Sequence, residues 1–135
     1  SMNRHREMIL IRAALGVYVL FLSFLLLAPD PLKLLGFAGP PGGSSLRMVH
    51  FSLFTVLGFL VWASHWPARP GVVIGLLLAY ALVTESLQWF IPTRSVELLD
   101  YLENLLGLVA GGAAWHVLQS RGSAARRSDS NREGE

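Results

Sequence analysis

Long apolar stretches constrain this chain more than any other feature of its sequence. From Met8 to Ala28 the only charged residue is Arg12. Such a stretch has the roughly 20 residues that a helix needs to cross about 30 Å of hydrocarbon at about 1.5 Å per residue. A signal peptide is the alternative, because a basic segment around His5 precedes the stretch. The apolar run is longer than the usual limit of about 15 residues, however, and no small-x-small cleavage site follows it, so we predict a retained membrane span.

Three more stretches of similar length predict three more spans. They are Met48 to Trp66, Gly71 to Phe90 and Leu98 to Leu118. The connection from Pro29 to Arg47 is dense in proline and glycine, which break helices, and we expect it to lie outside the hydrocarbon. The predicted fold class is therefore all-α, a polytopic membrane helical bundle of four transmembrane helices within residues 8–118. Residues 119–135 are polar and lack large apolar side chains, which predicts a disordered tail.

Composition supports a membrane protein and excludes several kinds of chemistry. Only 15% of the residues are charged, against about 25% in an average soluble chain. The absence of cysteine excludes disulfides, thiol nucleophiles and cysteine-ligated metal centres, and no cofactor is predicted. The basic residues gather at the chain ends instead of forming a stripe with aromatic residues, which argues against nucleic-acid binding.

The distribution of basic residues predicts the topology of the four spans. Eight arginines fall on the side of the N-terminus: Arg4, Arg6, Arg12, Arg69, Arg121, Arg126, Arg127 and Arg132. Three basic residues fall on the other side: Lys33, Arg47 and Arg94. Because basic residues favour the cytoplasm, both termini should be cytoplasmic, with residues 1–7 as a cytoplasmic N-terminus and residues 119–135 as a cytoplasmic tail. The predicted location is the bacterial inner membrane, as a multi-pass protein.

The last predicted span carries Gly107 and Gly111, a small-xxx-small pair on one helix face. Small residues at this spacing let two membrane helices approach closely, so we expect the pair to pack against a neighbouring span. Four spans are too few to enclose a wide pore in a monomer, and a homo-oligomer is compatible with the sequence.

Polar residues inside the predicted spans gather at one depth. His50 lies near the start of the second span, and Glu85 and Gln88 lie in the last two turns of the third. Asp100 and Asn104 lie in the first turns of the fourth. With the predicted topology all five fall in the outer leaflet, where burial of a carboxylate in hydrocarbon is costly unless the group is paired or hydrated. Their agreement in depth predicts one outward-facing polar pocket.

The spacing of these residues supports the same pocket. Glu85 and Gln88 are three residues apart and share a helix face, and so do Asp100 and Asn104, which are four apart. We expect the two faces to meet across the bundle. Arg94 lies in the short connection between them, where its guanidinium could form bidentate contacts with Glu85 or Asp100. Glu103 lies about 60° round the helix from Asp100, away from Asn104, and has no assigned role.

Residues 85–94 fit the pattern E-x-x-Q-x-x-x-P-x-R, and residues 100–107 fit D-x-x-x-N-x-x-G. These two motifs resemble the VanZ-like family of small bacterial membrane proteins. An earlier element of the family is partly kept at Arg47, His50, Phe51, Phe54, Leu57 and Gly58. Leu46 stands where the family usually has an aspartate, and the resemblance spans residues 46 to 112.

The resemblance implies a link to the cell envelope, because the founding member of the family is associated with low-level resistance to the glycopeptide teicoplanin. Our first hypothesis is a binding protein for an anionic envelope lipid, a glycan or a glycopeptide, with membrane lipids and a peptidoglycan-precursor lipid or lipoglycopeptide as partners. The residues expected to bind are Arg47, His50, Glu85, Gln88, Arg94, Asp100 and Asn104.

Two other functions and a structural role stay open. An enzyme acting on an envelope lipid would use His50, Glu85 or Asp100 in acid–base catalysis, with Arg94 stabilising developing negative charge. Those three residues could instead hold one divalent metal ion, although no metal is predicted. A proton-linked transporter is the third function, since carboxylates inside membranes often relay protons. Gln88, Asp100 and Asn104 could also serve only as hydrogen-bonding contacts between helices.

Overall fold

Four helices make up the part of the chain that the structure describes. The computed structural model describes residues 2–28, 36, 44–91 and 98–133, with the backbone alone for residues 44–47 and 133. The helices are α1 (Met2–Leu27), α3 (Ser44–Ala63), α4 (Pro70–Gln88) and α5 (Leu98–Glu133). The fold is all-α, as the apolar stretches predict, and each predicted span has its own helix.

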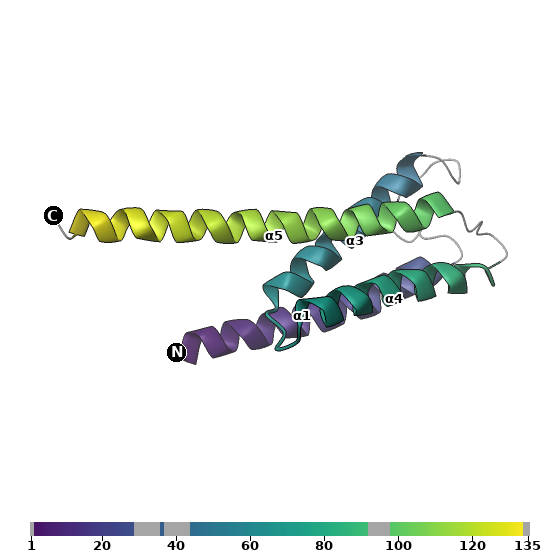
Figure 1. Cartoon of the computed structure of the whole chain (residues 1–135). Coiled ribbons are helices and arrows are strands. Elements are labelled where there is room, and N and C mark those ends of the chain that lie inside the picture. The colour runs from purple at the N-terminus through teal and green to yellow at the C-terminus, as the bar shows by residue number, and fades with distance from the viewer. Residues whose placement is uncertain (1, 29–35, 37–43, 92–97, 134–135) are drawn as a thin grey trace.

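Helix α3 lies at the centre of the arrangement. It runs diagonally between α5 and the pair formed by α1 and α4, and its packing against α5 is the most extensive in the molecule (Figure 1). Helix α1 contacts α3 and α4, and α4 also contacts α5. The hydrophobic core joins all four helices through Leu15, Leu22, Leu26, Phe54, Leu57, Ala81 and Leu108. Helix α3 therefore joins α5 to α1, and the N-terminal parts of α3 and α5 lie at the same end of the bundle (Figure 1).

Glycines allow α3 and α5 to approach closely. A Cβ atom placed on Gly107 would lie 2.6 Å from the carbonyl oxygen of Phe51, and one on Gly111 would lie 2.0 Å from that of Thr55. On the opposite helix, a Cβ atom on Gly58 would lie 2.5 Å from the carbonyl oxygen of Leu108. No side chain fits at these distances, so the helices meet backbone to backbone. The small-xxx-small prediction is confirmed, and α3 is the helix against which the pair packs.

Hydroxyl groups fix α1 against two neighbouring helices. The hydroxyl group of Tyr18 in α1 donates a hydrogen bond to the carbonyl oxygen of Leu53 in α3. The hydroxyl groups of Ser23 in α1 and Tyr80 in α4 lie 2.8 Å apart and share a hydrogen bond. These specific polar contacts show that α1 is an integral part of the helical bundle.

The surface of the bundle is unusually apolar. Helices α1 and α4 are each long and apolar enough to cross a membrane, yet only 22% and 17% of their most apolar windows are buried in the fold. Leu20, Leu76 and Val109 are among many large side chains that point outward. A core helix of a soluble protein would be mostly buried, so these outward surfaces suit contact with lipid instead of water. Among the described residues, α3 and α5 do not meet the length and hydropathy criteria for a membrane span.

Helix α5 differs most from its predicted bounds. The sequence predicts an end at Leu118 and a disordered tail, whereas in the structure the helix continues without a break to Glu133 and extends beyond the rest of the bundle (Figure 1). Side chains from 116 to 132 are exposed, so no tertiary packing holds this extension. Extending an existing helix costs much less than nucleating one, and the alanines and arginines of this segment are good helix formers.

Candidate functional site

The late part of α4 meets the early part of α5 through a buried polar contact. Asn104 Nδ2 donates a hydrogen bond of 3.3 Å to Glu85 Oε2. Glu85 is 4% exposed and Asn104 is fully buried. The other polar atom of that amide, Asn104 Oδ1, is also buried and accepts no hydrogen bond from the residues that the structure describes. The predicted meeting of the two polar faces therefore occurs at this pair.

Gln88 takes a different partner from the one that its spacing suggests. Its Nε2 atom donates a 3.0 Å hydrogen bond to the carbonyl oxygen of Leu26, near the end of α1. The last four carbonyl groups of a helix have no partner within the helix, and Gln88 satisfies one of them. Gln88 is 2% exposed and ties α4 to α1, while Glu85, one turn earlier, ties α4 to α5.

His50 lies at the same end of the bundle, in the early part of α3. It is buried, and its neighbour Phe51 packs directly against Gly107, one turn after Asn104. We call the four buried residues His50, Glu85, Gln88 and Asn104 the polar cluster. Between them they come from α3, α4 and α5, and Gln88 adds a contact to α1. The sequence predicts all four of these residues for the site; Thr84, beside Glu85, is also buried, but its hydroxyl group donates to carbonyl oxygens of its own helix.

Of the three other predicted residues, only Asp100 has a described side chain. Arg94 lies outside the described residues, and of Arg47 the structure describes only the backbone, within α3. Asp100 is half-buried in the first turn of α5 and makes no hydrogen bond or ion pair with a described residue. No three His, Asp or Glu side chains come together within residues 2–28, 44–91 and 98–133, so His50, Glu85 and Asp100 do not form a metal site there.

The opposite end of the bundle has a polar contact that the sequence analysis did not assign. Arg12 in α1 donates hydrogen bonds to the carbonyl oxygens of Ser64 (3.2 Å) and His65 (3.0 Å), just after the end of α3. Its guanidinium also lies 5.0 Å from the ring centre of Trp66. His65 has a φ of 43°, in the left-handed region that often ends a helix. Arg12 thus holds the turn that ends α3. The sequence feature that could have indicated this contact is a charged residue inside an apolar stretch.

Replacing Arg12 with leucine should destabilise the bundle by about 1 kcal/mol, because two carbonyl groups lose a charged donor and a cation–π contact is lost. The measurement is the free energy of unfolding during SDS titration of the detergent-solubilised protein. Arg4→Leu is the matched control, since Arg4 is exposed on the same helix. Equal stability of the two variants would show that Arg12 does not hold the turn.

The fold and the polar cluster fit a small integral membrane protein of the helical class. Comparison with protein-family models matches residues 30–119 to the model described as VanZ/LLP1. This match covers most of the chain and includes every residue of the polar cluster. The chain therefore belongs to the VanZ/LLP1 family, as its motifs predict, and the family is linked to glycopeptide resistance. No curated protein and no solved structure matches the chain.

Proposed function

We propose that this protein crosses the bacterial inner membrane four times and binds an anionic cell-envelope lipid, a glycan or a glycopeptide at the outward end of the bundle. Both termini are cytoplasmic in this proposal, which places the polar cluster in the outer leaflet. Family membership supports a role at the envelope, and the apolar outward surfaces of α1 and α4 support the membrane location.

The Glu85–Asn104 contact is the observation that carries the proposal. It joins α4 to α5 in the buried interior, and it leaves Asn104 Oδ1 buried without a hydrogen bond from a described residue. A buried acceptor left unsatisfied costs about 1–3 kcal/mol. A hydroxyl or amide donor of a ligand would remove this cost, and glycans and glycopeptides are rich in both groups.

The proposed roles divide between recognition and orientation. Arg94 and Arg47 supply positive charge for a phosphate or carboxylate of the ligand, since guanidinium groups form paired hydrogen bonds with such anions. Glu85 and Asn104 orient polar groups of the ligand that reach the cluster. His50, in α3 at the same end of the bundle, also contributes to ligand binding. Gln88 holds α1 and α4 together.

Native mass spectrometry of the detergent-purified protein tests this function. The wild-type protein should retain an envelope lipid or glycolipid, and Arg94→Ala and Glu85→Gln should both lose it. Arg121→Ala is the matched control, because Arg121 is exposed in the C-terminal part of α5, away from the polar cluster. This variant should keep the ligand. If all four proteins carry the same loosely bound lipids, the polar cluster is a structural contact and the proposed function is wrong.

A further inference from the structure

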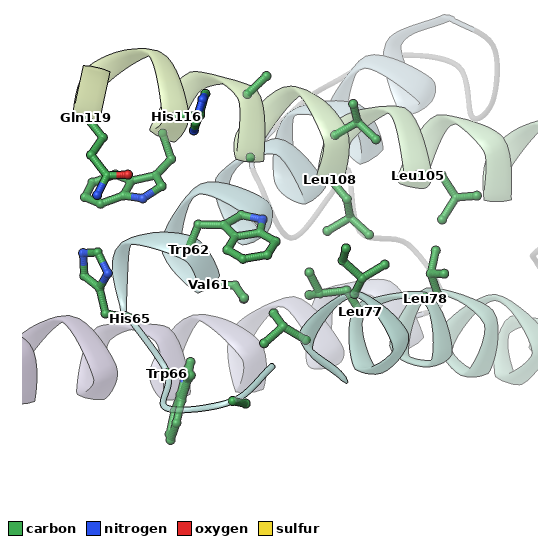
Figure 2. A pocket seen from close by; sticks show the side chains of 17 residues that line it. Val61, Trp62, His65, Trp66, Leu77, Leu78, Leu105, Leu108, His116 and Gln119 are labelled. Carbon is green, nitrogen blue, oxygen red and sulfur yellow. The ribbon is translucent and has the colours of Figure 1, made fainter. Parts of the chain in front are cut away.

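An apolar groove lies between α4 and α5 (Figure 2) and extends from Leu105, next to Asn104, to Gln119 farther along α5. Its volume is about 870 Å³, at the upper end of the range for small-molecule sites. Leu77 and Leu78 of α4 line one side, and Leu105 and Leu108 of α5 line the other. The end of α3 contributes Trp62, which lies between the two sides (Figure 2).

The groove changes character along its length. Leucine, isoleucine and valine side chains line the part toward the middle of the bundle. At the other end, which we call the mouth, the lining residues are His65, Trp66, His116 and Gln119. The ring of His65 packs edge-on against that of Trp115, with 5.4 Å between the ring centres. The described residues that line the groove include no carboxylate, so nothing in its wall repels an anion.

Two arginines adjoin residues that line the groove. Arg12 lies against Trp66, which lines it. Arg69 directly follows Ala68, another lining residue, and is exposed at the start of α4, where its side chain makes no capping hydrogen bond. Two arginines next to imidazole, indole and amide donors form a setting that favours a phosphate group.

We propose that this groove binds an acyl chain of an anionic phospholipid, with the phosphate of that lipid at the mouth. One wall of the groove belongs to α4, a candidate membrane span, so the groove adjoins hydrocarbon. An empty apolar groove there would lose dispersion contacts along its walls, and lipid chains are the molecules available to restore them. The apolar lining of the groove matches the acyl chain of such a lipid, and the positive charge near the mouth matches its phosphate.

This lipid site is separate from the proposed envelope site. His116 at the mouth is 12 residues from Asn104 along α5, which corresponds to about 18 Å. The mouth of the groove and the polar cluster therefore lie at different depths in a membrane that the bundle crosses, although the other end of the groove reaches Leu105, next to Asn104. The groove proposal rests on the membrane location but not on the ligand of the polar cluster, so either can fail without the other.

Tryptophan fluorescence in lipid vesicles tests the groove directly. Trp62, Trp66 and Trp115 line it, whereas Trp89 is exposed at the far end of α4 and is replaced by phenylalanine in all the proteins tested. The full chain is placed in phosphatidylcholine vesicles that contain equal shares of brominated phosphatidylglycerol or brominated phosphatidylcholine. The anionic brominated lipid should quench the fluorescence about fivefold more effectively, as expected when a basic residue near the membrane surface attracts it.

Two neighbouring substitutions on α5 separate the groove from the general lipid surface. Ala113 lines the groove and Ala114 does not, although both are exposed. Ala113→Phe should abolish the preferential quenching, whereas Ala114→Phe should keep it. Arg69→Gln should lower the preference for the anionic lipid without abolishing quenching.

Equal quenching by the two brominated lipids, or equal behaviour of the two alanine variants, would overturn the proposal. Weak quenching by both lipids, together with a dimer that Ala113→Phe dissociates, would show that a second copy of the chain fills the groove. Size-exclusion chromatography of each variant in detergent tests whether a lost signal comes from unfolding. Ala114→Phe tests whether a phenylalanine at a neighbouring position of α5 disturbs the fold.

Discussion

Gly111→Ala should destabilise the bundle by about 2–3 kcal/mol. The added methyl group would lie 2.0 Å from the carbonyl oxygen of Thr55 and 2.6 Å from the backbone nitrogen of Phe59. Both atoms belong to the backbone of α3, so no side chain can turn aside, and the two helices must separate. Overpacking of this kind typically costs about 1–3 kcal/mol, and separation also removes contacts along the whole α3–α5 interface.

A second glycine on the same helix provides the control for this substitution. A Cβ atom on Gly122 would meet nothing within 4 Å, so Gly122→Ala adds helix propensity without a clash. It should stabilise the protein by up to about 1 kcal/mol. The two alanine substitutions therefore have opposite expected signs in an SDS titration. A neutral or stabilising effect of Gly111→Ala would show that the close approach of α3 and α5 is absent from the folded protein.

Asn104→Leu should destabilise the protein by about 2 kcal/mol. It removes the donor that lies 3.3 Å from Glu85 Oε2 and leaves a buried carboxyl group with one hydrogen bond fewer. Hydrogen bonds between membrane helices contribute about 0.6 kcal/mol on average, but the loss of a donor to a buried carboxyl group adds a penalty of about 1–3 kcal/mol. The penalty depends on the carboxyl group, so the double variant Glu85→Leu with Asn104→Leu should lose less stability than the sum of the single variants.

Asn131→Leu is the matched control for this pair, because Asn131 is exposed on the same helix. It should change the free energy of unfolding by less than about 0.5 kcal/mol. Additive effects of the Glu85 and Asn104 substitutions would contradict the contact between them, since residues that interact directly do not behave independently.

Helix positions and the face by which α5 packs closely could be predicted from local patterns, whereas its partner α3 could not. Apolar stretches of sufficient length gave the four helices, and the spacing of Gly107 and Gly111 gave the packing face. The meeting of the helix face that carries Glu85 with the face that carries Asn104 could also be predicted, because polar residues at one depth in apolar helices have few other ways to satisfy their hydrogen bonds.

Contacts with backbone groups could not be predicted in the same way. Gln88 and Arg12 both bind carbonyl groups at or just beyond the end of a neighbouring helix, and the sequence pattern does not show which helix end lies nearby. The extension of α5 to Glu133 was missed for another reason. Its polar composition signals a segment without a packed face, and such composition does not by itself prevent a helix from continuing.

The outward position of the polar cluster is the central claim, and cysteine labelling measures it most directly. The chain contains no cysteine, so each single-cysteine variant carries one reactive site. Phe90 is exposed just after α4, beside the cluster, and Ala68 is exposed in the turn at the opposite end. In spheroplasts, a membrane-impermeant maleimide should label Phe90→Cys and should label Ala68→Cys only after permeabilisation. Labelling of Ala68→Cys alone in intact spheroplasts would place the polar cluster on the cytoplasmic side and contradict the proposed envelope site.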